Sequence, residues 1–212
     1  MNHIFDFFFD AYSATPTSQI VLEIIAFIFG IASVWYAKQE NILVYPTGII
    51  CTVITVYLLF INRYLGDMMM NFYYSIMSIY GWWNWSRKKG NNYLVPISRT
   101  TKKEKQIGVI LFFITVVITF LVYKAFDYTI EIPNYIDIIT SGIFFTAMWY
   151  MANKKIENWT LWIVGDLITI PLYAYRGLGL LSLQYLIFTI LAIYGYREWK
   201  KSLSNNHQTV LK

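Results

Sequence analysis

The sequence predicts an all-α integral membrane protein with seven transmembrane helices, its N-terminus outside and its C-terminus in the cytoplasm. Three observations lead to this fold class: the composition, the lengths of the apolar segments and the placement of the basic residues. Of 212 residues, 57% are hydrophobic and only 14% are charged, whereas soluble domains carry about 25% charged residues. Such a composition excludes an ordinary soluble domain.

Seven apolar segments approach the roughly 20 residues that a helix needs to cross the hydrocarbon core. We expect membrane helices at 19–37, 42–61, 68–85, 107–125, 135–151, 159–175 and 180–199. The third and sixth segments are the least hydrophobic of the seven. This indicates that these two helices face a cavity rather than lipid.

The helices divide the chain into five parts. The segment 1–18 contains no Lys or Arg and carries Asp6 and Asp10, so we interpret it as an interfacial segment and not as a signal peptide. The first three helices occupy 19–86, a basic loop and a linker helix occupy 87–134, and the last three helices occupy 135–200. The remaining residues, 201–212, form a cytoplasmic tail.

The basic residues set the orientation. Fourteen of the 17 Lys and Arg residues fall on one side of the predicted helices, and the three others are Arg63, Lys124 and Arg176. Basic residues gather on the cytoplasmic side of membrane proteins, which places the C-terminus in the cytoplasm. The net charge of +5 is therefore attributed to membrane orientation, and no nucleic-acid partner is expected.

The first three and last three helices carry a common pattern about 114 residues apart. Three helices end on the opposite side from where they begin, and the fourth crosses back, so the two units are predicted to be parallel repeats. Parallel repeats with a site at their interface are a recurrent transporter design. The matches are Trp35-Tyr36 with Trp149-Tyr150, Ile79-Tyr80-Gly81 with Ile193-Tyr194-Gly195, Trp85 with Trp199, and, after a three-residue insertion, Glu40-Asn41 with Glu157-Asn158.

Familiar enzyme signatures are missing from the sequence. The histidines, His3 and His207, both lie in the tails, and the chain has no HExxH motif, glycine-rich phosphate loop or nucleophile elbow. We therefore expect no metal, no cofactor and no enzymatic activity.

Asp166 is the sharpest candidate for a functional residue, because it falls near the middle of a predicted membrane helix. A charged side chain there costs ~2.5–3.5 kcal/mol on insertion scales. Trp159, Trp162 and Asp166 follow at i, i+3 and i+7 and share one helix face. Two aromatic rings beside a carboxylate suit a flat organic cation. The alternative is that Asp166 joins its helix to a neighbour through hydrogen bonds.

A second polar face lies on the third helix. Asn71, Tyr74 and Ser78 again follow at i, i+3 and i+7, and an amide both donates and accepts hydrogen bonds. Gln184 falls within one residue of the repeat position that matches Asn71. These side chains are expected either to bind the hydroxyl or amide groups of a ligand or to link helices.

Several of these motifs resemble the PnuC-type vitamin transporter family. The run Ile79-Tyr80-Gly81-Trp82-Trp83-Asn84-Trp85 after Asn71-Phe72-Tyr73-Tyr74 resembles the third helix of that family. The stretch 154–162, KKIENWTLW, resembles the start of its sixth helix, and Tyr194-Gly195 with Trp199 resembles its last helix. The resemblance covers nearly all of the two three-helix units, and little of the linker and fourth helix.

The resemblance implies a three-plus-one-plus-three helix fold, similar to that of the SWEET sugar transporters, in a homo-oligomer, a trimer. It implies uptake of the vitamin nicotinamide riboside across the inner membrane by facilitated diffusion, with trapping by cytoplasmic phosphorylation. Many members that carry this substrate have Gln where this chain has Asn71. A thiamine transporter of the same family therefore stays as an alternative. A different class of function, the substrate-binding subunit of a larger energised transporter, is also left open. The substrate contacts carried over are Asn71, Tyr74, Trp159, Trp162 and Asp166, together with Trp149 and Gln184.

Overall fold

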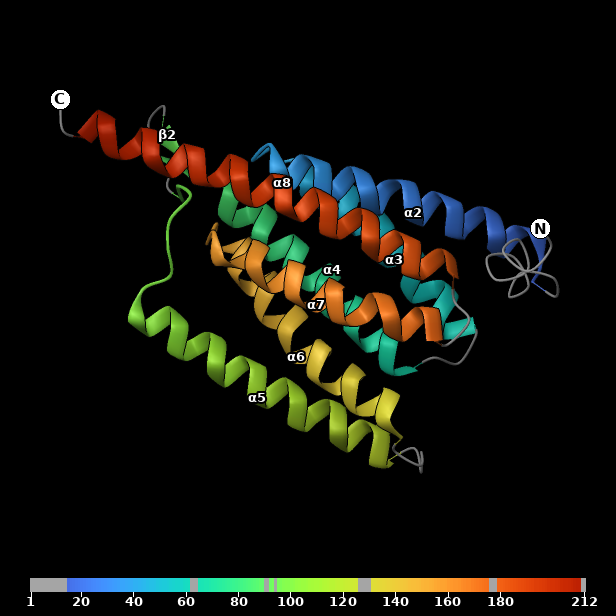
Figure 1. The fold of residues 1–212 in the computed structure, drawn as a ribbon. Coiled ribbons are helices and arrows are strands. Elements are labelled where there is room, and N and C mark those ends of the chain that lie inside the picture. The colour runs from blue at the N-terminus through green and yellow to red at the C-terminus, as the bar shows by residue number, and fades with distance from the viewer. Residues whose placement is uncertain are drawn as a thin grey trace.

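The structure, a computed structural model, describes residues 15–61, 65–89, 92–93, 95–125, 131–175 and 179–210. Within these ranges the chain forms seven long helices, and consecutive helices run antiparallel (Figure 1). The predicted helices are confirmed to within a few residues at most ends. The last one is longer than predicted, because it continues past 199 to Val210. The helices are α2 (Thr17–Lys38), α3 (Val44–Ile61), α4 (Leu65–Ser86), α5 (Lys102–Ala125), α6 (Ile132–Ala152), α7 (Glu157–Tyr175) and α8 (Gly179–Val210).

The linker between α4 and α5 holds local structure that the sequence did not reveal. Two short antiparallel strands, β1 (Lys88–Lys89) and β2 (Asn92–Tyr93), form a ribbon after α4. Further on, the Ser98 amide donates to the Lys154 carbonyl at 3.0 Å, and the Ile156 amide donates to the Ser98 carbonyl at 3.0 Å. Strands this short show no measurable hydrophobic alternation. The linker is thus attached to the connection between α6 and α7.

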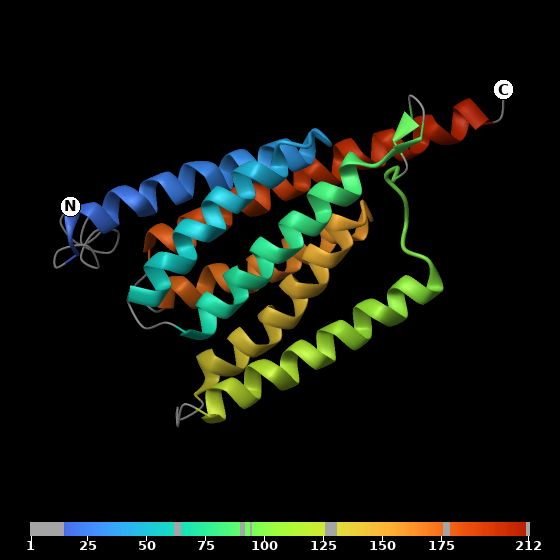
Figure 2. The same ribbon diagram turned by 180° about the vertical axis from the view of Figure 1, so that it is seen from behind.

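Six of the helices pack in a closed order. Helices α2, α3 and α4 pack in succession, and so do α6, α7 and α8. The order closes because α4 packs on α6 and α8 packs on α2. Helix α5 lies outside these six, against α6 (Figure 2). We call α2–α4 the first half and α6–α8 the second half.

Three of the described helices, α2, α3 and α5, are long and apolar enough to cross a membrane by length and composition alone. Their outer faces are covered with exposed apolar side chains, for example Val109, Ile110 and Phe113 on α5. The other four helices carry more polar residues and are packed alongside them. An amphipathic helix can lie within a membrane bundle when its polar side chains face other helices.

The connections α2–α3 and α6–α7 have the same backbone structure. Glu40 and Lys154, 114 residues apart, both adopt a left-handed conformation, with φ of 57° and 51°. The amide after each, at Asn41 or Lys155, donates to the carbonyl five residues earlier at 2.9 Å. The predicted three-residue insertion is therefore wrong. By backbone conformation Glu40 matches Lys154. It does not match Glu157, although Glu157 is a residue of the same type.

Four large aromatic side chains repeat the same spacing. Tyr45 packs edge-on against Trp85 with ring centroids 5.1 Å apart, and Trp159 packs edge-on against Trp199 at 5.5 Å. Each pair has a glycine beside one of its rings, where a larger residue would collide with that ring. A Cβ on Gly81 would lie 2.4 Å from the Tyr45 ring, and one on Gly195 would lie 2.6 Å from the Trp159 ring.

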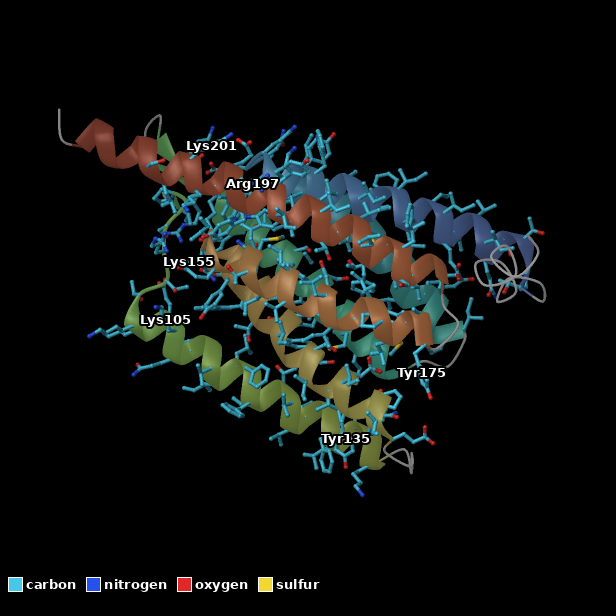
Figure 3. All side chains as sticks on the ribbon, in the orientation of Figure 1. Lys105, Tyr135, Lys155, Tyr175, Arg197 and Lys201 are labelled. Atoms are coloured by element: carbon cyan, nitrogen blue, oxygen red, sulfur yellow. The ribbon has the colours of Figure 1, made fainter. Side chains whose placement is uncertain are left out.

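The buried core and the basic residues occupy the same end of the molecule. The best-buried large side chains include Tyr45, Trp85, Ile156, Trp159 and Trp199. Figure 3 shows Lys105, Lys155, Arg197 and Lys201 towards this end, with Tyr135 and Tyr175 towards the other. We call it the basic end.

Candidate functional site

Asp166 is buried in the middle of α7, with 2% of its surface exposed. Among the described residues no hydrogen bond or ion pair to its carboxylate is found, and its oxygens are not among the fully covered polar atoms that lack a partner. A buried acid without a partner is unfavourable, and such residues in membrane helices mark ligand or ion pathways. The alternative that Asp166 joins α7 to a neighbouring helix therefore finds no support in the hydrogen bonds of the described residues.

Trp162 lies one turn before Asp166 on α7 and joins two neighbouring helices. Its ring stacks on Phe144 of α6 with centroids 5.4 Å apart and an angle of 27° between the planes. It also meets Tyr74 of α4 at 6.3 Å. Aromatic side chains from α4, α6 and α7 thus meet one turn before the acid, and Phe144 also lies against Gly165, the residue next to Asp166.

The aromatic contacts continue on both sides of Trp162. Phe144 stacks on Tyr185 of α8 at 6.1 Å. On the other side, Tyr74 lies 6.3 Å from Phe145, and Phe145 stacks on Tyr73 at 3.7 Å. Six side chains take part in these contacts: Tyr73, Tyr74, Phe144, Phe145, Trp162 and Tyr185. We call them the aromatic belt, and the term here means this group between the helices and not the Trp and Tyr residues at the membrane interfaces. It connects α4, α6, α7 and α8 at the level of Asp166, and aromatic faces of this kind attract flat rings and cations.

The structure brings together three of the predicted site residues: Tyr74, Trp162 and Asp166. Asn71 lies one turn before Tyr74 on the same helix, and its carbonyl accepts a hydrogen bond from the Ser75 hydroxyl at 3.0 Å. That hydroxyl also contacts Thr52 of α3 at 2.8 Å. Asn71 thus lies on the same face of α4 as Tyr74.

Three other predicted residues have their contacts outside the aromatic belt. Ser78 is buried close to Gly48 of α3. Gln184 of α8 lies near Gly30 of α2, where a Cβ would come within 3.7 Å of its Nε2. Trp149 packs on its neighbour Tyr150. Their contribution to a binding site stays a prediction.

Trp159 differs most from its expected surroundings. It is 1% exposed and belongs to the core of the basic end, where it packs on Trp199 and Gly195. Trp159, Trp162 and Asp166 do share one face of α7, but α8 covers this face at Trp159. In the described part of the chain, its Nε1 is buried without a hydrogen-bond partner. A role in substrate contact stays a prediction for this residue too.

Sequence reasoning missed Phe144 and Tyr185. An aromatic residue in an apolar helix cannot be distinguished from a lipid-facing or packing residue by its pattern alone. The repeat contained a signal for Tyr185, because a constant spacing of 114 matches it with Asn71. The same spacing matches Asp166 with Thr52, so only the second half supplies a carboxylate at this level. In addition, the described residues contain no group of three His, Cys, Asp or Glu that is suited to a metal ion.

Comparison with known proteins identifies related transporters. The family model described as "Nicotinamide mononucleotide transporter" matches residues 20–201. The crystal structure of the vitamin B3 transporter PnuC has the same fold, with a TM-score of 0.70 over 92% of this chain and 86% of that chain, at 21% sequence identity.

Two curated relatives extend the comparison. The nicotinamide riboside transporter PnuC of Escherichia coli is 26% identical over 204 residues, which cover 85% of each chain. The riboflavin/roseoflavin transporter RibM of Streptomyces davaonensis is 26% identical over 125 residues, which cover 58% of each chain.

The isolation of Asp166 predicts that its charge does not stabilise the fold. Asp166→Asn should keep or raise the melting temperature in detergent, because it removes a buried charge that has no partner. Asn84→Leu is the contrasting variant, because its amide donates to the Ala152 carbonyl at 3.0 Å. Losing that bond should cost ~1–3 kcal/mol. A melting temperature that falls as far in Asp166→Asn as in Asn84→Leu would show that Asp166 is a packing residue.

Proposed function

Because this chain belongs to the nicotinamide mononucleotide transporter family, we propose that it takes up nicotinamide riboside by facilitated diffusion. The chain is a membrane transporter and not an enzyme. We place it in the inner membrane, where phosphorylation of the product in the cytoplasm would trap the vitamin. The observation that carries the substrate proposal is the unpartnered Asp166 beside the aromatic belt.

The chemistry of the site favours a flat cation. Nicotinamide riboside contains a pyridinium ring with a permanent positive charge, which Asp166 would neutralise while Trp162 and Phe144 contact its face. A cation on an aromatic face gains ~0.5–2 kcal/mol, most when water is excluded. Asn71 and Gln184 are proposed to contact the carboxamide or ribose groups, whose donors and acceptors match theirs.

The relatives carry two kinds of ring, one charged and one neutral. RibM carries riboflavin or roseoflavin, whose ring system has no permanent charge. A neutral ring gains little from a buried carboxylate. Asp166 therefore supports a pyridinium or thiazolium substrate, and thiamine is the alternative within the same chemical class.

We also propose that the two halves are parallel repeats related by an axis along the membrane normal, with α5 as the linking helix. The matched conformations of Glu40 and Lys154, and the matched aromatic pairs, support this arrangement. The basic end is proposed to face the cytoplasm and the N-terminus the outside. A homotrimer is proposed on the family resemblance alone, and the mass of the solubilised particle tests it.

The substrate proposal predicts a selective effect of the Asp166 charge. Asp166→Asn should weaken nicotinamide riboside binding by ~1.5–3 kcal/mol, roughly ten- to hundredfold in Kd. Trp162→Ala should weaken it as well, and the two losses should be less than additive because both residues hold one ring. Titration calorimetry on purified protein with nicotinamide riboside, thiamine and riboflavin measures these values.

Two controls belong to that titration. Thr169→Val removes a buried hydroxyl whose one hydrogen bond among the described residues lies within its own helix, to the Gly165 carbonyl at 2.8 Å, and it should leave Kd unchanged. An uncharged dihydropyridine analogue should bind poorly and should not distinguish Asp166→Asn from the parent. Tighter binding of riboflavin than of either cation, or an unchanged Kd in Asp166→Asn, would contradict the proposed site.

Transport is predicted to be passive, because the described residues contain no group of three or more His, Cys, Asp or Glu side chains from which a proton or sodium relay could be built. In proteoliposomes, labelled nicotinamide riboside should equilibrate across the membrane and should not accumulate under a proton or a sodium gradient. Accumulation above the outside concentration with either gradient would reveal a coupling site.

The orientation is tested with single cysteines in a Cys51→Ala background. In intact spheroplasts a membrane-impermeant maleimide should label Tyr175→Cys and should not label Lys105→Cys, because these exposed residues lie towards opposite ends (Figure 3). The labelling should reverse in inside-out vesicles. The opposite pattern would invert the proposed topology.

A further inference from the structure

An ion pair joins the two halves at the basic end. Lys154 Nζ lies 2.6 Å from Glu40 Oε1, and the side chains are 3% and 36% exposed. The same Nζ lies 4.6 Å from the centre of the Trp85 ring. Lys154 belongs to the α6–α7 connection and Glu40 to the α2–α3 connection. The two positions are repeat equivalents, so under the proposed symmetry their contact lies on the axis between the halves.

Other bonds between the halves surround this pair. The amide of Asn84 and the indole of Trp85, at the end of α4, donate to the carbonyls of Ala152 and Met151 at the end of α6. The indole of Trp199 donates to the Ala37 carbonyl at 3.0 Å. These contacts close the bundle at the basic end, so they lie nearer to that end than the aromatic belt does.

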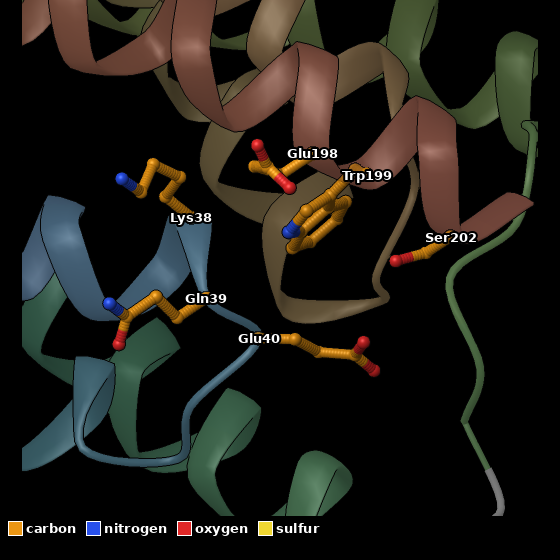
Figure 4. Close-up of a pocket in the computed structure, with 6 residues that line it drawn as sticks. All are labelled: Lys38, Gln39, Glu40, Glu198, Trp199 and Ser202. Atoms are coloured by element: carbon orange, nitrogen blue, oxygen red, sulfur yellow. The ribbon is translucent and has the colours of Figure 1, made fainter.

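The two members of the pair are held differently. Lys154 is fixed to the second half, because its carbonyl accepts from the Ser98 amide of the linker, and the next residue, Lys155, forms an ion pair with Glu104 of α5 at 2.8 Å. Glu40 borders a cavity of about 330 Å³, whose other lining residues include Lys38, Glu198 and Trp199 (Figure 4). Water therefore reaches the carboxylate while the ammonium is covered.

We infer that the Lys154–Glu40 ion pair is a latch that holds the basic end closed and must open during each transport cycle. A buried ion pair gives little net stability, because desolvation of both charges offsets their attraction. Such a contact can open and re-form. Losing the Glu40 carboxylate removes this counter-charge from the covered ammonium of Lys154, which favours an arrangement in which water reaches the ammonium. This inference rests on the proposed transport function, and the assignment of the opening step to the cytoplasmic face rests on the proposed orientation.

Charge reversal tests the latch without any substrate. Ala152 is fully buried at the interface between the halves, so Ala152→Cys in a Cys51→Ala background reports opening of the basic end. Glu40→Lys should speed its labelling by a maleimide in detergent at least tenfold. Glu40→Lys combined with Lys154→Glu restores an ion pair and should return the rate to within about twofold of the parent.

Lys155→Glu provides the matched control, since it breaks the neighbouring ion pair with Glu104 of α5, which does not join the two halves. It should lower the melting temperature and leave the labelling rate unchanged. Equal labelling of Glu40→Lys and its parent, equal acceleration by Lys155→Glu, or failure of the double reversal to restore the rate would each overturn the latch. Should Glu40→Lys fail to fold, Glu40→Gln replaces it, with a threefold or greater acceleration expected and an unchanged rate again decisive against the latch.

A crosslink tests the requirement for opening. Glu40→Cys with Lys154→Cys, joined by a short bifunctional methanethiosulfonate, should lose uptake of nicotinamide riboside and regain it after reduction. The same treatment of Lys155→Cys with Glu104→Cys should leave uptake unchanged. Full uptake by a fully crosslinked latch would overturn the inference. A protein that carries none of the tested vitamins would instead contradict the proposed substrate, and the labelling result would stand by itself.

Discussion

Two indole N–H groups donate hydrogen bonds to carbonyls at helix ends, and the arrangement of the two halves depends on these two bonds. The last carbonyls of a helix have no partner within it, and such groups are costly where water is scarce. Trp199 of α8 donates to Ala37 at the end of α2, and Trp85 of α4 donates to Met151 at the end of α6. Each donor comes from the opposite half. Both carbonyls also accept a backbone amide of the following connection, that of Glu40 at 3.1 Å or of Lys154 at 3.0 Å. The indole therefore adds a second hydrogen bond at each helix end, and this second bond fixes one half against the other.

The packing around these indoles explains why the core lies at one end. Gly81 and Gly195 leave room for the Tyr45 and Trp159 rings against α4 and α8. Edge-on aromatic contacts then join each ring to Trp85 or Trp199. Between lipid-exposed helices there is no hydrophobic driving force, so close packing and hydrogen bonds hold the bundle together. Stability is concentrated here, and this allows the middle of the bundle to keep an unfavourable group.

Asp166 is that unfavourable group. Local rules of folding oppose a buried carboxylate without a partner, and natural proteins break such rules mainly at functional sites. The aromatic belt lies beside the same segment of α7, where Trp162 contacts rings of α4 and α6, and Phe144 in turn contacts a ring of α8. The α6–α7 connection is also bonded to the linker through Ser98 and to α5 through the Lys155–Glu104 ion pair. These bonds distinguish the α6–α7 connection from the α2–α3 connection, although the two connections have the same backbone structure.

The sequence by itself determined the helices, the basic end and the acid beside Trp162, because length, apolar composition and charge act locally. It also revealed the repeat, but it matched Glu40 with Glu157 by residue type, whereas the backbone matches it with Lys154. Only the tertiary structure decided that Trp159 is a core residue, that Phe144 and Tyr185 join the belt, and that Lys154 meets Glu40. These facts depend on which helix covers which face, and contacts between residues on different helices, from 18 to 114 positions apart, leave no periodic signal in the chain.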